Sequence, residues 1–475
     1  MVAVQQTDRK WTRHLVEVRS IDYIPPSERH GRVRDQFTVW TAANATALNI
    51  FFGSLAILLG LNFLWAVIAI VVGTVIGALM TSLHALQGPK LGLPQLLQSR
   101  AQFGYYGAVI FFLGFIVVEF GFMASQLVIQ AYSMHQVVPG ISIPVWAFIA
   151  VIPVTLIAIF GYDWVHRWQR WATIVLSITA IVMLIQALTY NGHLAKSASG
   201  TAAPSLALFL VVTVIFIINI AGWAPNVSDY SRYLPEDVRF RPVFFAVFFG
   251  NVLPTVAFAI IGAYITGLLP AASLYGAVQH ISGDWALVIM AISLTGTNVF
   301  NTYTGMLSMI STADTFAKVK RTVTPRVIGI LVMVVAALIA AVLGYHSFLN
   351  NFVNFLDVLI FIFFPWSAIN LADFYVVRHG HYEIPPFFER NGPYGLVQAP
   401  AAIAYIVGLI VELLFVNQTY FTGPLVKYIN GVDISWILGF VVPFILYCII
   451  ARPAGGRARR AGGAVPASPS ALSAP

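Results

Sequence analysis

Glu119, Phe122 and Gln126 are spaced so that a single helix face would present a carboxylate, an aromatic ring and an amide together. They lie within the apolar stretch GYYGAVIFFLGFIVVEFGFMASQLVIQAYS, and spacing of three and seven residues places side chains on one face of a helix. A carboxylate at membrane depth costs at least about 2.5 kcal/mol and seldom faces lipid. The pattern favours ligand binding or proton transfer; a glutamate bonded to a neighbouring helix purely for packing is the alternative.

A second pattern is GWAPNVSDYSRYLP, residues 222–235, which follows the apolar run SLALFLVVTVIFIINIA. Pro225 cannot donate to the carbonyl four residues earlier, and Gly222 relaxes the chain. Backbone groups freed from a helix survive in lipid only where they face protein or a water-filled cavity. The pattern predicts a broken helix with Trp223 at the break, and a simple proline kink is the alternative.

A third pattern is the run of hydroxyl and amide side chains in ISLTGTNVFNTYTGMLSMISTAD. Hydroxyl oxygens can coordinate a hard cation such as sodium, which prefers oxygen ligands. Hydrogen bonds between helices, worth about 0.6 kcal/mol each, are the alternative use of such residues. The run comprises Ser293, Thr295, Thr297, Asn298, Asn301, Thr302 and Tyr303.

Composition identifies the environment of these patterns. The chain has 475 residues, of which 59% are hydrophobic and only 9% charged, whereas a soluble domain has roughly 25% charged residues. We therefore predict an all-α integral membrane protein. Residues 1–35 are polar and basic and lack an apolar stretch, so we expect no cleavable signal peptide before the first span. Because a spanning helix needs roughly 20 apolar residues, the sequence predicts twelve spans: 35–59, 63–85, 104–133, 143–160, 170–190, 205–234, 243–268, 283–313, 325–343, 350–377, 397–416 and 434–451.

The basic residues predict the orientation of these spans. With a cytoplasmic N-terminus, all of the 26 Lys and Arg residues except Lys196 and Lys427 fall on the cytoplasmic side, as the positive-inside rule requires. We therefore expect a multi-pass protein of the plasma (inner) membrane with both termini cytoplasmic. The net charge of +8 then reflects topology, so we expect the lipid bilayer and no nucleic acid as a partner.

The first predicted span also carries a break signal, because TAANATALNIFFGS places Asn44, Thr46, Asn49 and Gly53 at membrane depth. Breaks in helices one and six, five spans apart, are typical of transporters built from two inverted five-helix repeats. The expected organisation is a cytoplasmic tail at 1–34, a core at 35–378 with repeats 35–190 and 205–378, two peripheral helices at 397–451, and a disordered cytoplasmic tail at 452–475.

Two motifs carry a resemblance to a known family. GWAPNVSDYSRYLP resembles the signature of the nucleobase-cation symporter family, which contains purine-cytosine permeases and the sodium-hydantoin symporter. GPKLGLPQLLQSRAQFGYYGA, residues 88–108, resembles that family's loop between helices 2 and 3. The resemblance covers roughly residues 30 to 450 and implies the leucine-transporter fold, with ten core helices in two inverted repeats, two peripheral helices and alternating access around a central site.

The resemblance also implies a substrate site. Trp223, beside Gly222, matches the tryptophan that stacks on a flat heterocycle, and Phe122 matches the aromatic residue on its other side. Gln126 matches a hydrogen-bonding glutamine, whereas Thr46 stands where the family often has glutamine. The helix 8 asparagine is either Asn298 or Asn301.

For the coupling ion, the resemblance implies a sodium site formed by carbonyls near Ala42 and Ala45 together with Ser293, Gly296 and Thr297. Glu119 offers a proton acceptor instead, so both H+ and Na+ are open. We expect no cofactor besides the coupling ion.

The sequence therefore predicts a secondary transporter that imports a nucleobase or related planar heterocycle by cation symport with alternating access. Alternatives are a transporter of the same fold for allantoin, a hydantoin, a vitamin precursor or an amino acid, or a channel or membrane enzyme. We expect no enzyme, because the ten histidines are scattered. A Walker motif for ATP binding is absent from the sequence, and the single cysteine, Cys448, allows neither a disulfide nor a cysteine metal site.

Overall fold

The computed structural model describes residues 22–461 apart from 161, 191, 271, 318, 320, 321 and 419. The described chain is helical, with one isolated β-bridge between Asn417 and Thr422. Most of the predicted N-terminal tail and residues 462–475 of the predicted C-terminal tail lie outside the described residues. The last helix continues to Ala461, past residue 452, where the sequence predicts a disordered tail.

The first half of the chain forms six long helices, two of them from a single predicted span. They are α2 (Val33–Asn44), α3 (Ala47–Leu58), α4 (Phe63–Ala85), α7 (Val109–Val137), α8 (Ile143–Phe160) and α9 (Tyr162–Thr189). The connection between α4 and α7, expected to be a loop, contains two short helices, α5 (Gln87–Leu91) and α6 (Gln95–Phe103).

The second half of the chain forms further long helices and two short ones. Its elements are α11 (Leu206–Ala221), the 3-10 turn η2 (Ala224–Asn226), α12 (Val227–Ser231), α13 (Phe240–Leu268), α15 (Asp284–Phe316), α16 (Val323–Gly344), α17 (Phe348–Ala372), α18 (Ala399–Phe415) and α19 (Ser435–Ala461). Short helices α10 (Lys196–Ser199) and α14 (Leu274–Ser282) lie in connections.

Length and hydropathy identify seven stretches of the described chain that can cross a membrane, or eight when α2 and α3 are one broken span. Three shorter apolar helices lie at 143–159, 399–415 and 435–451. The protein is therefore a multi-pass membrane protein, and the number twelve stays a prediction.

Both segments with break signals are interrupted in the structure. The axes of α2 and α3 differ by 55°, because Ala45 (φ −77°, ψ 71°) and Thr46 (φ −132°, ψ 154°) leave the helical conformation. The Asn49 side-chain amide donates to the freed Asn44 carbonyl at 2.6 Å. This bond supplies the carbonyl with a donor, which lipid cannot do. In the second segment, α11 ends at Ala221 and Pro225 lies in the 3-10 turn that leads into α12, but Leu206–Ser231 continues as one stretch without the sharp bend of the first segment.

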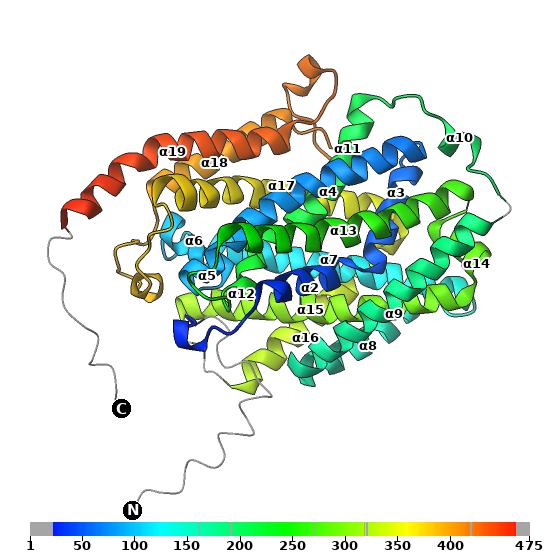
Figure 1. Ribbon diagram of the computed structural model, residues 1–475, viewed down its shortest axis with the longest axis horizontal. Helices are drawn as coiled ribbons and strands as arrows, with labels where there is room; N and C mark the ends of the chain where they lie inside the picture. The colour runs from blue at the N-terminus through cyan, green and yellow to red at the C-terminus, as the bar shows by residue number, and fades with distance from the viewer. Residues whose placement is uncertain are drawn as a thin grey trace, which may run out of the picture.

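The long helices pack as a bundle with the two added helices at one edge (Figure 1). α7 packs along α15, while α2, α3 and α4 pack against α13. Gly53 of α3 and Gly262 of α13 allow the closest approach, because a Cβ on either would overlap a backbone carbonyl of the other helix. α18 and α19 pack on each other and on α17. The described N-terminal end, α12 and the end of α19 lie at the left of the bundle in Figure 1, and α10 and α14 lie at the right.

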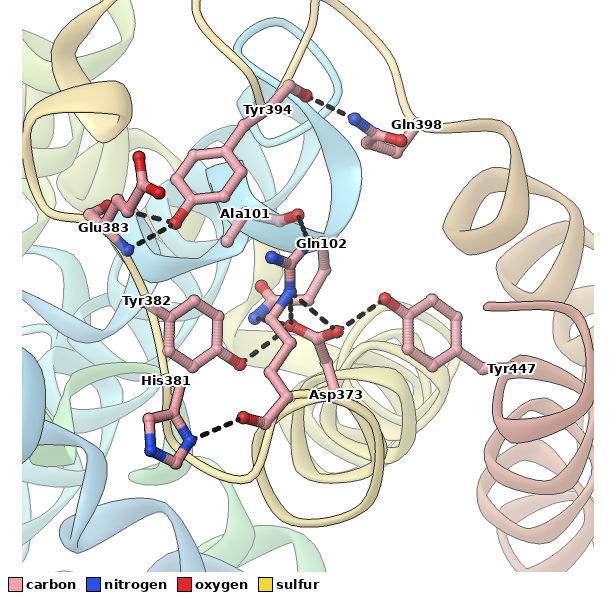
Figure 2. A network of polar contacts seen from close by, with 10 residues as sticks. Ala101, Gln102, Asp373, His381, Tyr382, Glu383, Tyr394, Gln398 and Tyr447 are labelled. Carbon is pink, nitrogen blue, oxygen red and sulfur yellow. Dashed lines mark hydrogen bonds and ion pairs between the residues drawn. The ribbon is translucent and has the colours of Figure 1, made fainter. Parts of the chain in front are cut away.

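A buried carboxylate holds the end of α17 to its neighbours (Figure 2). Asp373, at the start of the π-turn η4 (Asp373–Val377), accepts from Gln102 of α6 at 3.0 Å. It also accepts from the hydroxyls of Tyr382 and Tyr447, each at 2.8 Å, and from Arg378 Nε at 3.1 Å. The network thus connects α6, α17 and α19.

Two tyrosines of the loop after η4 surround Arg378. Its guanidinium lies 5.4 Å from the ring centroid of Tyr382 and 5.3 Å from that of Tyr394. Burial raises the pKa of Tyr394 to about 12. Burial, followed by the charge of Asp373, raises the pKa of Tyr382 well above its usual range. Both phenols therefore favour their neutral form in the folded protein.

Candidate functional site

A cavity of about 30 Å³ lies where the two interrupted segments meet α7 and α15. This volume holds about two water molecules, so a bound heterocycle requires the lining side chains to move apart. Eight of the predicted site residues line the cavity: Thr46, Glu119, Phe122, Gln126, Gly222, Trp223, Thr297 and Asn301.

The two predicted stacking rings reach this cavity from different helices. Trp223 stands at the end of α11, with its ring centroid 5.8 Å from that of Trp40 and 5.8 Å from that of Phe300. Phe122 of α7 makes an edge contact with Phe355 at 5.3 Å. A Cβ added at Gly222 would lie only 3.8 Å from the Phe122 ring, so the lack of a side chain there leaves the ring accessible from the break.

Glu119 and three polar side chains form one continuous array across α7 and α15. The Asn301 amide lies 3.1 Å from Glu119 Oε2 and 3.1 Å from Gln126 Nε2. Gln126 Oε1 accepts from the Thr297 hydroxyl, for which the Leu294 carbonyl at 3.0 Å is the alternative acceptor. All four side chains are buried. The carboxylate is therefore linked to the cavity amides by hydrogen bonds.

The two alternative asparagines lie in different surroundings. Asn301 lines the cavity, whereas Asn298 lies outside its lining and donates to Gln130 Oε1 at 3.0 Å. Gln130 donates in turn to the Ala291 carbonyl at 2.8 Å. This geometry favours Asn301 as the residue that faces a ligand and Asn298 as a contact between α7 and α15.

Sequence reasoning missed a chain of asparagine amides that joins the two breaks. Asn219 of α11 donates to Asn49 Oδ1 at 2.7 Å, and Trp223 Nε1 donates to Asn44 Oδ1 at 3.3 Å. Asn44 also donates to Asn251 of α13 at 2.8 Å. The available signal was the single polar residue in each of two apolar runs, FIINIA and FFGNVLP, because a lone amide at membrane depth needs a partner.

Of the candidate sodium ligands, Thr297 lines the central cavity. Ala45 is in the break between α2 and α3, and Ala42 and Thr297 line a second cavity of about 490 Å³ together with Trp223. The Ser293 hydroxyl donates to the Met290 carbonyl at 2.7 Å, so its lone pairs are free to face a cation. Gly296 is buried in the same turn of α15. The donor set consists of oxygens alone, which suits sodium.

A third cavity lies at the opposite end of the bundle. It measures about 430 Å³ and is lined by Phe51, Tyr132, Tyr275 and Phe348, among others. Phe348 is linked to Phe122 at the central cavity by ring contacts through Phe352 and Phe355, with centroid separations of 5.6, 6.3 and 5.3 Å. The central cavity thus adjoins the 490 Å³ cavity and is separated from the 430 Å³ cavity by a layer of rings.

Comparison with known proteins places the chain among membrane permeases. The family described as permease for cytosine/purines, uracil, thiamine and allantoin matches residues 23–439. The chain is 35% identical over 448 residues to the putative purine-cytosine permease YxlA of Bacillus subtilis, covering 92% of this chain and 96% of that protein. It is 25% identical over 462 residues to the purine-cytosine permease fcyB of Emericella nidulans, covering 91% and 87%.

Solved structures show the same fold. Mhp1, a nucleobase-cation-symport-1 family transporter, in a closed conformation with bromovinylhydantoin bound, matches with a TM-score of 0.71 at 17% identity, covering 94% of this chain and 96% of that chain. Its inward-facing conformation matches with a TM-score of 0.72 at 18% identity, covering 94% and 95%. The resemblance noted in the sequence is confirmed, and because the relatives are permeases the chain is a transporter and not an enzyme. The chain belongs to the family of permeases for cytosine and purines, uracil, thiamine and allantoin.

Proposed function

We propose that the chain imports a nucleobase or a related planar heterocycle, of the cytosine or purine class, by symport with a cation. The observation that carries this proposal is the convergence of Trp223, Phe122 and Gln126 on one cavity at two helix breaks. Offset stacking on an aromatic ring is worth about 0.5–1.5 kcal/mol beyond burial. The names of the two permease relatives support the same substrate class.

Each cavity residue has a distinct role in the proposed site. Trp223 and Phe122 contact the two faces of the ring, and Gln126 and Asn301 bond to its edge. Thr46 and the open backbone at Gly222 complete the wall. Asn298 has a supporting role, because its amide is bonded to Gln130.

Alternating access is supported by the arrangement of the cavities. The 490 Å³ cavity is lined by residues of α2, α9 and α15, and the 430 Å³ cavity by residues near α14 and η3 (Tyr345–Ser347). Both adjoin elements that meet at the central cavity, which is too small in this conformation for a heterocycle. Transport then requires the central cavity to open toward one side at a time.

For the coupling ion we favour a proton taken up by Glu119. This carboxylate lines the central cavity and is 3% exposed, so a change in its charge acts directly on the proposed ligand. Sodium bound by Ala42, Ala45, Ser293, Gly296 and Thr297 is the second candidate, because Thr297 lines both the central and the 490 Å³ cavity.

The proposed setting is the plasma (inner) membrane with both termini in the cytoplasm. The described N-terminal end and the end of α19 lie at the same end of the bundle as α5, α6 and α12 (Figure 1). The sequence places basic residues in these connections, including Lys90 and Arg100, whereas Lys196 belongs to α10 at the opposite end.

Uptake of labelled cytosine, adenine, uracil, allantoin and hydantoin into proteoliposomes tests this proposal. We expect one of these heterocycles to be taken up by the wild-type chain and Trp223→Ala to abolish that uptake. The matched control is Trp171→Ala, because Trp171 is 66% exposed on the outer surface of α9. Normal uptake by Trp223→Ala would remove the site assignment, and uptake of amino acids instead would favour the alternative substrate class.

A further inference from the structure

The Asn301 amide joins Glu119 to Gln126, and it can do so in two orientations. With its nitrogen toward Glu119, Nδ2 lies 3.1 Å from Glu119 Oε2 and 3.2 Å from the Thr297 carbonyl oxygen, while Oδ1 lies 3.1 Å from Gln126 Nε2. Turning the amide by half a revolution exchanges its donor and acceptor ends at the same positions. Which orientation is stable depends on what Glu119 and Gln126 offer.

An ionised Glu119 selects one orientation. A carboxylate only accepts hydrogen bonds, so Asn301 must turn its nitrogen toward Glu119 and its oxygen toward Gln126. Gln126 then donates from Nε2 to Asn301 and accepts through Oε1 from the Thr297 hydroxyl. Every hydrogen bond in this array points toward the carboxylate.

A protonated Glu119 permits the reverse array, which an ionised Glu119 does not. The carboxylic acid gains an O–H donor, which pairs with the Asn301 oxygen once that amide has turned. The Asn301 nitrogen then faces Gln126, whose own amide turns and directs Nε2 toward the Thr297 oxygen. The Thr297 hydroxyl retains an acceptor in the Leu294 carbonyl at 3.0 Å.

The two arrays differ by a single proton. The only bond formed is the O–H bond of Glu119, with the proton supplied from the aqueous phase, and the other changes are rotations. Each array pairs donors with acceptors from Glu119 through Asn301 and Gln126 to the Thr297 hydroxyl. The reverse array also sets the Asn301 oxygen against the Thr297 carbonyl oxygen, at the position 3.2 Å away, so it forms only when the hydrogen bond from the Glu119 O–H outweighs that contact. A mixed arrangement would set two donors or two acceptors against each other, and an unpaired buried polar group is costly.

We infer that Asn301, in addition to its proposed ligand contact, transmits the protonation of Glu119 to Gln126 and reverses the hydrogen-bonding pattern that Gln126 offers to the ligand. The inference rests on the proposed function, in which Gln126 contacts a heterocycle and Glu119 takes the coupling proton. A planar heterocycle can carry an N–H group and a C=O group side by side on one edge. A side-chain amide bonds to both groups only when its nitrogen faces the C=O and its oxygen faces the N–H. Ligand and proton binding are thereby coupled, and such coupling is reciprocal.

Other charged groups lie on the helices around α7, and the array itself contains one carboxylate, that of Glu119. Asp229 of α12 accepts from the Gln95 backbone N–H at 2.8 Å. The helices packed against α7 also carry Arg100 of α6, His280 of α14, Asp284 and Asp314 of α15, Arg326 of α16 and Asp357 of α17. Asn301 is the residue whose amide lies within hydrogen-bond distance of both Glu119 and Gln126.

Infrared difference spectroscopy of the purified full chain, recorded between high and low pH without ligand, tests the inference independently of transport. We expect a protonated carboxyl band to appear together with changes in side-chain amide bands, identified by ¹³C labelling of asparagine and glutamine side chains. Glu119→Gln should remove both signals. A carboxyl band without amide changes, no carboxyl band at all, or amide changes that persist in Glu119→Gln would each overturn the inference. Because the labelled wild-type protein suffices for the first measurement, a misfolded variant does not prevent the test.

Ligand affinity provides the second measurement. Binding of labelled cytosine or adenine should change at least about fivefold across the titration of Glu119, which lies at the lower end of typical coupling factors, and less than about twofold in Asn301→Leu. The matched control is Asn351→Leu, at an exposed asparagine near the start of α17 that donates to the Gly344 carbonyl; its pH dependence should equal that of the wild type. Uniformly weaker binding with an unchanged pH dependence in Asn301→Leu would overturn the inferred role of Asn301. Failure of the wild type to bind any heterocycle would instead refute the proposed function, while the infrared result would still decide the inference.

Discussion

Replacing Asp373 by asparagine should destabilise the protein more than the same change at Asp357 of α17. The Asp373 side chain is fully buried and the Arg378 side chain is 33% exposed. Asparagine keeps the shape of the side chain but removes its charge and turns one of its two acceptor oxygens into a donor. The Tyr382 hydroxyl donates to Oδ2 and the Tyr447 hydroxyl to Oδ1, so one of the two loses its acceptor, and Arg378 loses its charged partner.

The magnitude follows from the burial of the pair. Removing one partner of a buried ion pair costs about 3–5 kcal/mol. Water can reach the exposed third of Arg378 and offset part of this loss, so we expect the lower end, about 3 kcal/mol. The network connects three segments of the chain (Figure 2), so the loss should appear in global unfolding and not only in local fraying.

Thermal and denaturant unfolding in detergent, followed by tryptophan fluorescence, measures this effect. Asp357→Asn is the matched control, because Asp357 is also buried in α17 but its Oδ2 has no hydrogen-bond partner among the described residues. The control should change the free energy of unfolding by less than about 1 kcal/mol, because no hydrogen bond to Asp357 Oδ2 is lost. Equal destabilisation by the two substitutions would refute the role assigned to the Asp373 network.

Three further predictions concern ligand affinity, helix packing and pH. Gln126→Leu should weaken heterocycle binding by about 1–3 kcal/mol, roughly 5- to 150-fold in Kd by radioligand binding, and an unchanged Kd would show that Gln126 does not contact the ligand. Gly53→Ala should cost about 1–3 kcal/mol of unfolding free energy, because the added methyl group overlaps the Ala259 carbonyl, whereas Gly140→Ala has open space and should not. The folded-state pKa of Tyr394 is raised to about 12, above the unfolded value near 10, so the folded state retains a proton that the unfolded state loses. The stability contributed by this phenol should be complete below about pH 10 and disappear between about pH 10 and 12; alkaline unfolding should be less steep in Tyr394→Phe, and an unchanged slope would contradict the assignment.

Much of the architecture could be predicted because the membrane restricts the conformations that the backbone can adopt. Long apolar runs have to form helices in lipid, so the segments 63–85, 143–160 and 243–268 correspond closely to α4, α8 and α13. Helical spacing alone predicts that Glu119 and Gln126 lie on one face of their helix. The short helices α5 and α6 were not predicted, because this restriction applies only to long apolar runs.

The parts that could not be predicted depend on contacts between distant segments. Asn219 pairs with Asn49 across 170 residues, and periodicity within one helix carries no information about its partner. The same applies to Asp373, whose donors come from α6, the following loop and α19. The choice between Asn298 and Asn301 required the rotation of α15 relative to α7, which the sequence does not specify.

Accumulation of a labelled heterocycle in proteoliposomes under an imposed ion gradient tests the central claim, cation-coupled import through the cavity at the two helix breaks, most directly. With an acid exterior and no sodium gradient, we predict transient accumulation above the external concentration by the wild-type chain. Glu119→Gln should lose this accumulation and retain exchange of internal for external substrate. Accumulation driven by sodium at equal pH would assign the coupling to the candidate sodium ligands instead. Failure of the wild-type chain to accumulate any tested heterocycle under either gradient would contradict the account.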